Sequence, residues 1–142
     1  LVDLQDAGNV GTIIRTAEAL GVRRVCATAH TCDFYNSKVI RSAMGSLFRM
    51  ELVTVPDAVS FMQYARKMGA CSYASVVSDK AQSVGTFSFA KDSVLLIGNE
   101  GNGLSDEVAA AADHRVTIRM SGNTESLNAS VAACILMWEM NQ

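Results

Sequence analysis

Residues 94–103 read VLLIGNEGNG, a run of four apolar side chains followed by a loop that contains three glycines. A short apolar run with this flanking loop is typical of a strand buried inside a sheet. Ser105 or Asp106 can cap a helix directly after the loop. The stretch therefore predicts a buried strand, a tight glycine-rich turn and a helix, which is the repeating unit of an α/β fold.

The same alternation extends outward over the whole chain of 142 residues. Strand-like runs occupy residues 1–5, 22–28, 52–55, 71–77, 94–97 and 115–119, and helical patterns occupy residues 12–20, 37–44, 58–68, 106–112 and 127–140. Strands separated by helices of this length predict one α/β domain over residues 1–142, with a mostly parallel sheet flanked by helices. The chain opens at Leu1 without a methionine, so we expect an N-terminal part of a longer protein to be missing.

Composition and charge restrict the functional classes. Twelve basic and fourteen acidic side chains give a net charge of −2, which does not favour a polyanion as partner unless a local patch or a dimer groove attracts it. The apolar runs are too short to cross a membrane, and no secretory signal is visible. The four cysteines and two histidines lack metal-ligand spacing, so we expect no metal site, reduced thiols and a cytoplasmic location.

Three polar loops follow predicted strands, and ligands of open parallel sheets bind beyond the carboxyl ends of the strands. The first loop is DAGNVG at residues 6–11, the second is the glycine loop at residues 98–103, and the third is MSGNTESLNAS at residues 120–130. All three are rich in glycine and in small polar side chains that favour turns and helix caps. Each loop therefore contains candidate site residues.

In the first loop, Asn9 can cap the following helix, and Arg15 lies on that helix, where its guanidinium can hold an anion. The alternative is that Asn9 is only a cap and Arg15 only a solvated helix residue. In the second loop, main-chain amides can wrap a ligand, and Glu100 can orient Arg15 or a ribose hydroxyl. The alternative is a tight turn with a solvated Glu100, because the spacing is not that of a dinucleotide fingerprint.

In the third loop, Ser126 is well placed as the N-cap of the last helix, and Asn128 can reach another loop. The alternative is a polar loop with a capping serine and no further role. On the last helix, Leu127, Val131, Ile135 and Trp138 fall on one apolar stripe.

Taken in order, these segments resemble the three sequence motifs of the SpoU/TrmH family of RNA 2′-O-ribose methyltransferases. The matching stretches are DAGNVGTIIRTA at residues 6–17, LIGNEGNGL at residues 96–104 and IRMSGNTESLNASVA at residues 118–132, with a further family-like segment KVIRSAMGSLF at residues 38–48. The resemblance covers nearly the whole chain. It departs from the family at Ala7 and Arg119, where a proline is common, and this affects the rigidity of the loops rather than their chemistry.

The resemblance implies a SPOUT-type fold with a deep trefoil knot in its C-terminal part, a homodimer, S-adenosyl-L-methionine as cofactor and RNA as substrate, ribosomal RNA rather than transfer RNA. The last helix with Trp138 is then expected at the dimer interface. The residues that fall on the family's catalytic positions are Asn9, Arg15, Glu100, Ser126 and Asn128. Those that fall on its cofactor-binding positions are Gly98, Asn99, Gly103, Ile118, Met120 and Leu127.

The implied reaction transfers a methyl group from a sulfonium to a ribose 2′-hydroxyl, which requires alignment and removal of a proton. The family proposal makes the residue at Arg15 the proton acceptor. Because arginine is normally always charged, we expect Arg15 instead to contact the RNA phosphate and the attacking hydroxyl through its charge. Asn9, Glu100, Ser126 and Asn128 would fix the geometry around it.

The sequence also leaves two other functions open. One is a phosphate- or nucleotide-handling α/β protein that uses the glycine loop and does not bind S-adenosylmethionine. The other is an RNA-binding or scaffold protein that has kept the fold and lost turnover. Lys38, Arg41 and Arg49 can add positive charge for RNA, or they can be scattered surface charges.

Overall fold

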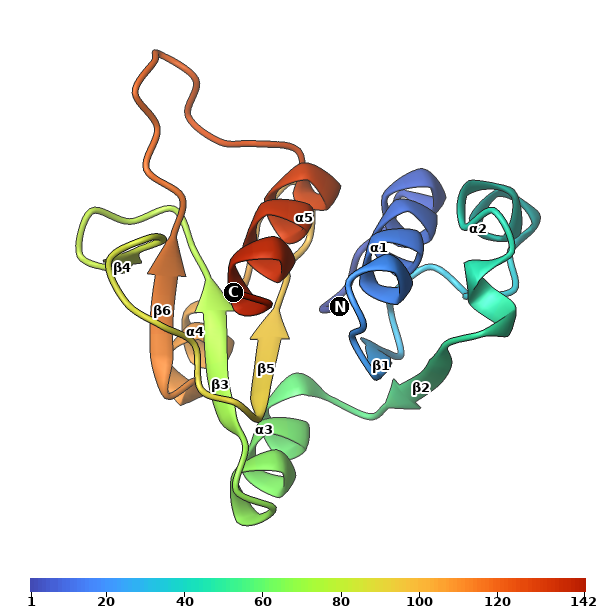
Figure 1. Ribbon diagram of the computed structural model, residues 1–142, viewed down its shortest axis with the longest axis horizontal. Helices are drawn as coiled ribbons and strands as arrows, with labels where there is room; N and C mark the ends of the chain where they lie inside the picture. Colours follow the sequence, from blue (N-terminus) through green and yellow to red (C-terminus); the bar gives the residue numbers. More distant parts are fainter.

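The computed structural model describes all residues from 1 to 142, and it confirms an α/β fold built on parallel strands (Figure 1). The elements are α1 (Ala7–Ala19), β1 (Arg24–Thr28), α2 (Ser37–Ser42), the 3₁₀ helix η1 (Ser46–Phe48), β2 (Glu51–Val55), α3 (Ala58–Lys67), β3 (Cys71–Ser75), β4 (Gln82–Ser83), β5 (Ser93–Leu96), α4 (Asp106–Ala111), β6 (His114–Thr117) and α5 (Ala129–Met140). The strands form a two-stranded sheet, β1-β2, and a four-stranded sheet, β4-β6-β3-β5, and every pairing is parallel.

The first two residues join these two sheets. The N–H of Thr28 donates to the carbonyl of Leu1 at 3.0 Å on one side, and the N–H of Val2 donates to the carbonyl of Ile97 at 2.8 Å on the other. The strand expected over residues 1–5 is nevertheless not formed as such, because Asp3 adopts a left-handed conformation with φ of 56°. The chain therefore leaves the sheet at Asp3 and enters the first predicted loop at the carboxyl edge of the sheet.

Helix α1 begins five residues earlier than the pattern at residues 12–20 predicts, and the predicted cap is wrong. Asp6, not Asn9, is the N-cap, and its carboxylate accepts a hydrogen bond from the N–H of Asn9 at 2.9 Å. Gly8 and Gly11 hid the first turns of the helix from sequence analysis, because glycine is a poor helix former. Gly11 is needed for close packing, since a Cβ there would lie 2.4 Å from the Cβ of Ser42 on α2.

The last helix also begins at a different residue from the one expected. Asn128 is the N-cap of α5 and accepts hydrogen bonds from the N–H groups of Ser130 and Val131, so the prediction that Ser126 caps this helix is wrong. Ser126 is exposed in the loop before it. Of the two caps predicted for the helix after the glycine loop, Ser105 is the one that caps α4, and Asp57 caps α3.

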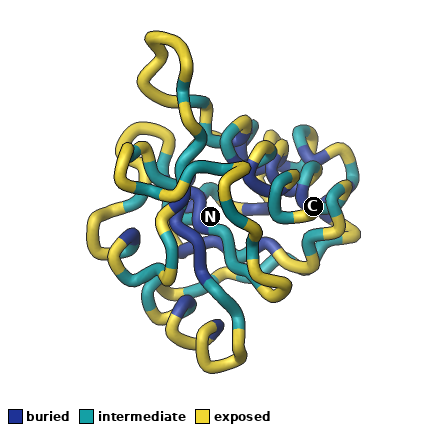
Figure 2. The backbone as a smooth tube through the Cα atoms, turned by 60° about the vertical axis from the view of Figure 1, so that its left-hand side comes forward, coloured by how far each residue is buried: buried dark blue, intermediate teal, exposed yellow.

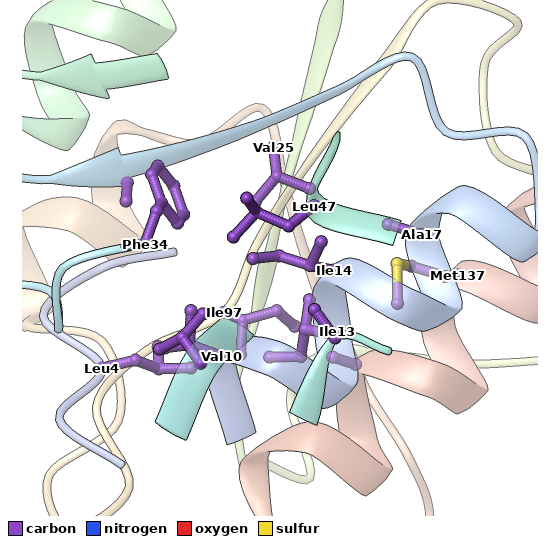
Figure 3. Close-up of a cluster of buried hydrophobic side chains, with 14 of the residues drawn as sticks. Leu4, Val10, Ile13, Ile14, Ala17, Val25, Phe34, Leu47, Ile97 and Met137 are labelled. Carbon is purple, nitrogen blue, oxygen red and sulfur yellow. The ribbon is translucent and has the colours of Figure 1, made fainter. Parts of the chain in front are cut away.

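Helices cover both faces of the larger sheet. Helix α5 lies on one face next to β5, and α1, which covers β1 of the smaller sheet, packs against α5 (Figure 1); the buried side chains of both helices belong to the main core. Figure 3 shows this core, where Ile13 and Ile14 of α1 lie among side chains from β1, η1 and α5. On the other face, α3 and α4 form a smaller cluster around Met62 and Leu96. Figure 2 shows that the buried residues concentrate in the interior and the exposed residues in the loops.

The apolar stripe predicted on the last helix does not face the core. Val131, Ile135 and Trp138 are 46%, 37% and 58% exposed, while the opposite side of α5 buries Ala133, Leu136 and other residues. Because α5 is apolar on nearly all sides, its sequence pattern could not indicate which side is buried. The structure thus leaves an exposed apolar stripe on the surface.

A cavity of about 710 Å³ lies between β1 and β5 and is lined mainly by apolar residues of the strands and of α1, α3 and α5. It contains none of the predicted catalytic residues. None of the helices combines the length and the apolar composition that crossing a membrane requires. The four cysteines are free thiols.

Candidate active site

Three polar side chains from three distant segments form one hydrogen-bonded chain. The Asn128 amide donates to the Oδ1 atom of Asn9 at 3.1 Å, and the Asn9 amide donates to Glu100 at 3.2 Å. Asn9 lies in the first turn of α1, Glu100 in the loop after β5 and Asn128 at the start of α5. The structure therefore brings the three predicted loops together at one edge of the sheet.

The carboxylate of Glu100 binds the first loop through main-chain groups. It accepts hydrogen bonds from the N–H groups of Gln5 and Asp6, each at 3.0 Å, in addition to the one from Asn9. Burial alone would raise the pKa of Glu100, but these donors outweigh it and hold the pKa below its ordinary value. Glu100 is thus an ionised clamp between two loops, and no hydrogen bond or ion pair joins it to Arg15.

Asn99 completes this clamp and shapes the glycine loop. Its amide donates to the carbonyl of Asp3 at 2.8 Å, and its Oδ1 atom accepts from the N–H groups of Gly101 and Asn102. The main chains of Asn99 and Gly103 pair with each other at 3.1 and 2.8 Å, which closes the loop. The side chain of Asn99, a predicted cofactor-binding residue, thus holds the two loops together.

Gly98 has a structural reason to be glycine. A Cβ at this position would lie 2.2 Å from the carbonyl carbon of Gly103, a distance that real Cβ atoms do not tolerate. The absence of a side chain therefore allows the loop to fold back on itself directly after β5. Gly103 also has a positive φ of 66°, which favours glycine.

The third loop carries unused main-chain polar groups. Residues 118–127 make no main-chain hydrogen bond within the chain, although Ile118, Met120 and Leu127 are partly buried. Because β6 and β5 both pair with β3 in parallel, this loop leaves the same sheet edge as the glycine loop. The predicted cofactor-binding residues of the second and third loops thus share one edge of the sheet.

Two predicted catalytic residues stand apart from the hydrogen-bonded chain. Arg15 lies on an exposed side of α1, six residues and about 9 Å of helix beyond Asn9, and it takes part in none of the five ion pairs. Ser126 is exposed and makes no hydrogen bond to Asn9, Glu100 or Asn128. The structure therefore joins three of the five predicted catalytic residues directly.

Sequence analysis missed two residues that build the site. Asp6 caps α1, and its pKa is lowered mainly by the hydrogen bond from the Asn9 main chain, with a further contribution from Lys38 at 3.5 Å. Asp3 accepts a hydrogen bond from Thr28 at 2.6 Å, and its own N–H donates to the same hydroxyl. An acidic residue three positions before Asn9 was the available signal for the cap.

A smaller cavity of about 330 Å³ adjoins the clamp. Its lining includes Asp3, Asn99, Asn102 and Gly103. It includes Asn99 and Gly103 among the predicted cofactor-binding residues, but not Gly98, Ile118, Met120 or Leu127. The structure brings no cluster of three His, Cys, Asp or Glu side chains together for a metal ion.

Comparison with known proteins agrees with this arrangement. The family model described as the SpoU rRNA Methylase family matches residues 1–138. The chain is 38% identical over 136 residues to a 23S rRNA (uridine(2479)-2'-O)-methyltransferase of Streptomyces viridochromogenes, covering 93% of this chain and 47% of that protein. It is 35% identical over 144 residues to a 23S rRNA (guanosine(2553)-2'-O)-methyltransferase of Bacillus subtilis, covering 99% and 56%.

A solved structure extends the similarity to three dimensions. The chain superposes with a TM-score of 0.87 and 34% identity on the SpoU methyltransferase AviRb from Streptomyces viridochromogenes in complex with the cofactor AdoMet, covering 99% of this chain and 54% of that one. The chain thus spans about half the length of these relatives. With the family model matched from the first residue to the last helix, this chain belongs to the SpoU rRNA methylase family.

Proposed function

We propose that the protein transfers a methyl group from S-adenosyl-L-methionine to a ribose 2′-hydroxyl of RNA, and of ribosomal RNA rather than transfer RNA. The observation that carries the proposal is the chain from Asn128 through Asn9 to Glu100, which joins the three motif loops at one sheet edge. The names of the two relatives, both 23S rRNA 2′-O-methyltransferases, support ribosomal RNA as the substrate.

The residues at this edge fit S-adenosylmethionine. The free main-chain N–H and C=O groups of residues 118–127 suit the polar edge of an adenine ring, and the partly buried side chains of Ile118, Met120 and Leu127 suit its faces. Gly98 lets the neighbouring loop fold back tightly onto the Gly103 main chain at the same sheet edge. When bound, the cofactor would supply an electrophilic methyl group.

The polar side chains would then orient the nucleophile and manage its proton. Arg15, exposed and without an ion-pair partner, is available to bind an RNA phosphate next to the attacking ribose and to stabilise negative charge that develops on its oxygen. Asn9, Glu100 and Asn128 fix the start of the helix that carries Arg15. Ser126, exposed in the third loop, is available to contact the substrate.

The protein is further proposed to act as a homodimer with a knotted C-terminal part. The exposed apolar stripe of Val131, Ile135 and Trp138 on α5 supports a protein interface, because contiguous exposed apolar side chains mark such sites. The knot enters the proposal through the family to which the chain belongs. The free thiols support a cytoplasmic location.

The proposal is tested by incubating the full-length protein with tritiated S-adenosylmethionine and ribosomal RNA, followed by nucleoside analysis. We expect label on a 2′-O-methylnucleoside, together with calorimetric binding of S-adenosylhomocysteine. Label on a base would contradict the reaction type. Binding of a mononucleotide without any binding of S-adenosylhomocysteine would favour a nucleotide-handling protein, and cofactor binding without transfer to any RNA would indicate a protein that has lost turnover.

A further inference from the structure

An exposed apolar turn follows α2 on the side of the molecule that carries α1. Met44 and Phe48 are 67% and 77% exposed, and Phe48 is the most exposed large hydrophobic side chain of the protein. Arg41, in the last turn of α2, is also exposed and takes part in no ion pair. Two large apolar side chains and an unpaired guanidinium thus occur within eight residues on the surface.

The backbone holds this turn in a defined shape. Met44 has a φ of 49° and Gly45 a φ of 84°, and the N–H of Ser46 donates to the carbonyl of Ala43 at 2.9 Å. Glu18 of α1 fixes the end of the turn, because its carboxylate accepts from Ser46 at 3.2 Å and from Arg49 at 2.9 and 3.3 Å. A left-handed conformation is unfavourable for a methionine, and here no burial of the side chain offsets it.

The turn lies level with Arg15. Helices α1 and α2 run in the same direction side by side, since Lys38 reaches Asp6 at the start of α1, Ser42 meets Gly11, and Arg49 binds Glu18 near its end. Arg15 lies between Gly11 and Glu18 on α1. Measured along the shared direction of the two helices, it is therefore level with the turn that follows Ser42. Figure 1 shows the two helices adjacent to each other at one side of the molecule.

The charges in this region leave positive charge unbalanced. Lys38 and Arg49 are each paired with a carboxylate, at 3.5 and 2.9 Å, whereas Arg15 and Arg41 are not paired. The protein as a whole is slightly acidic, so a local excess of free guanidinium groups beside exposed apolar side chains is a distinguishing feature. Single-stranded RNA is bound by this combination, with bases stacked on flat or polarisable side chains and phosphates on arginine.

We infer that Arg41, Met44 and Phe48 form a docking surface for single-stranded RNA that continues from Arg15, so that the nucleotides flanking the methylated one lie along α2. This inference rests on the proposed function, because RNA at Arg15 is what brings the strand to this turn. A second copy of the chain is a less suitable occupant, since α5 already presents a stripe of three exposed apolar side chains and two unpaired guanidinium groups would face one another across a symmetric contact.

The test measures binding of a fluorescein-labelled 12-nucleotide single-stranded RNA to the full-length protein by fluorescence anisotropy. The double variant Met44→Gly/Phe48→Ala should weaken binding at least about tenfold, as expected for the loss of one base stack. Phe48→Trp should keep the affinity, because it restores a stacking surface. Arg41→Ala should lower the slope of log K against log salt by about 0.7, the value for one phosphate contact on a single strand.

The matched control is Tyr64→Ala, an aromatic residue that is 60% exposed on α3, a helix that lies well away from α2 in Figure 1. Its RNA affinity should equal that of the wild type, and all variants should bind S-adenosylhomocysteine within about twofold of the wild type. The inference is overturned if the double variant binds RNA like the wild type, or if sedimentation shows that it loses a dimer instead. Failure of the proposed function is separate, because it appears as absent methyl transfer by the wild type.

Discussion

The side-chain amide of Asn128 donates a hydrogen bond to the side-chain oxygen of Asn9 at 3.1 Å, across 119 residues of sequence. Asn128 also caps α5, and Asn9 also binds Glu100. A single asparagine thus links the start of the first helix to both other motif loops. An amide suits this position because it donates and accepts at the same time.

Asn9→Asp tests this link. The variant keeps an acceptor for Asn128 but loses the donor to Glu100. The new carboxylate at position 9 then lies against the carboxylate of Glu100, where the wild type has a hydrogen bond. We expect the free energy of unfolding to fall by about 1–3 kcal/mol, because a partly buried hydrogen bond to a charged group is lost. Asn36→Asp is the matched control, because Asn36 only caps α2 and aspartate caps equally well. Equal stability of both variants in urea unfolding would contradict the role of Asn9.

Gly98→Ala should disrupt the loop after β5. The added Cβ would lie 2.2 Å from the Gly103 main chain, so the Asn99–Gly103 pairing must open. Overpacking of this kind costs about 1–3 kcal/mol, and we expect weaker binding of S-adenosylhomocysteine as well. Gly101→Ala, whose Cβ would be 3.5 Å from its nearest neighbour, should leave both quantities nearly unchanged. Thermal unfolding measures the stability of the two variants, and calorimetry measures their binding of S-adenosylhomocysteine. Equal values for Gly98→Ala and Gly101→Ala would contradict the role of Gly98.

Met44→Gly should stabilise the protein while it weakens RNA binding. Glycine adopts a positive φ without strain, and the exposed side chain of Met44 contributes little packing, so a gain of up to about 1 kcal/mol is expected. Met44→Val should do the opposite, because a β-branched residue is particularly unfavourable in this conformation. A Met44→Gly variant that melts below the wild type would show that the side chain is needed for folding.

Acid should destabilise the protein through hydrogen-bonded carboxylates. Ser72 lowers the pKa of Asp113 through hydrogen bonds from its hydroxyl and main chain, and Arg66 adds to this effect. A carboxylate with a lowered native pKa stabilises the fold fully above its ordinary value of 3.8 and loses that contribution as pH falls through the native pKa.

We therefore expect the free energy of unfolding to fall as the pH decreases below about 5, and to fall less steeply in Asp113→Asn. Glu125→Gln is the control, since Glu125 is exposed and has no hydrogen-bond partner. Identical acid unfolding curves for Asp113→Asn and the wild type would show that Asp113 does not contribute to the pH dependence.

Much of the fold follows from local sequence patterns. The apolar run of β5 and the alternation of strands and helices are determined by burial and hydrogen bonding within short segments, so the α/β class and most elements could be predicted. The order of the strands could not, because pairing of β3 between β5 and β6 depends on packing across the whole chain. Strand β4, with two residues, is too short to give a pattern.

The site was predictable in its residues but not in its contacts. Asn9, Glu100 and Asn128 were expected together from the family motifs, yet no pattern shows that Glu100 binds the main chain of Gln5 and Asp6. The helix starts were wrong at α1 and α5 because several polar residues in a row can each act as a cap. Tertiary contacts decide between Asp6 and Asn9, and between Ser126 and Asn128.

The most direct test of the account is the variant Arg15→Ala, compared with the wild type in two measurements on the full-length protein. Because Arg15 lies outside the hydrogen-bonded chain that joins the loops, S-adenosylhomocysteine should bind with unchanged affinity in calorimetry, while methyl transfer to the ribose of RNA should fall at least about a hundredfold. Near-normal methyl transfer by Arg15→Ala would contradict the assignment of the catalytic site.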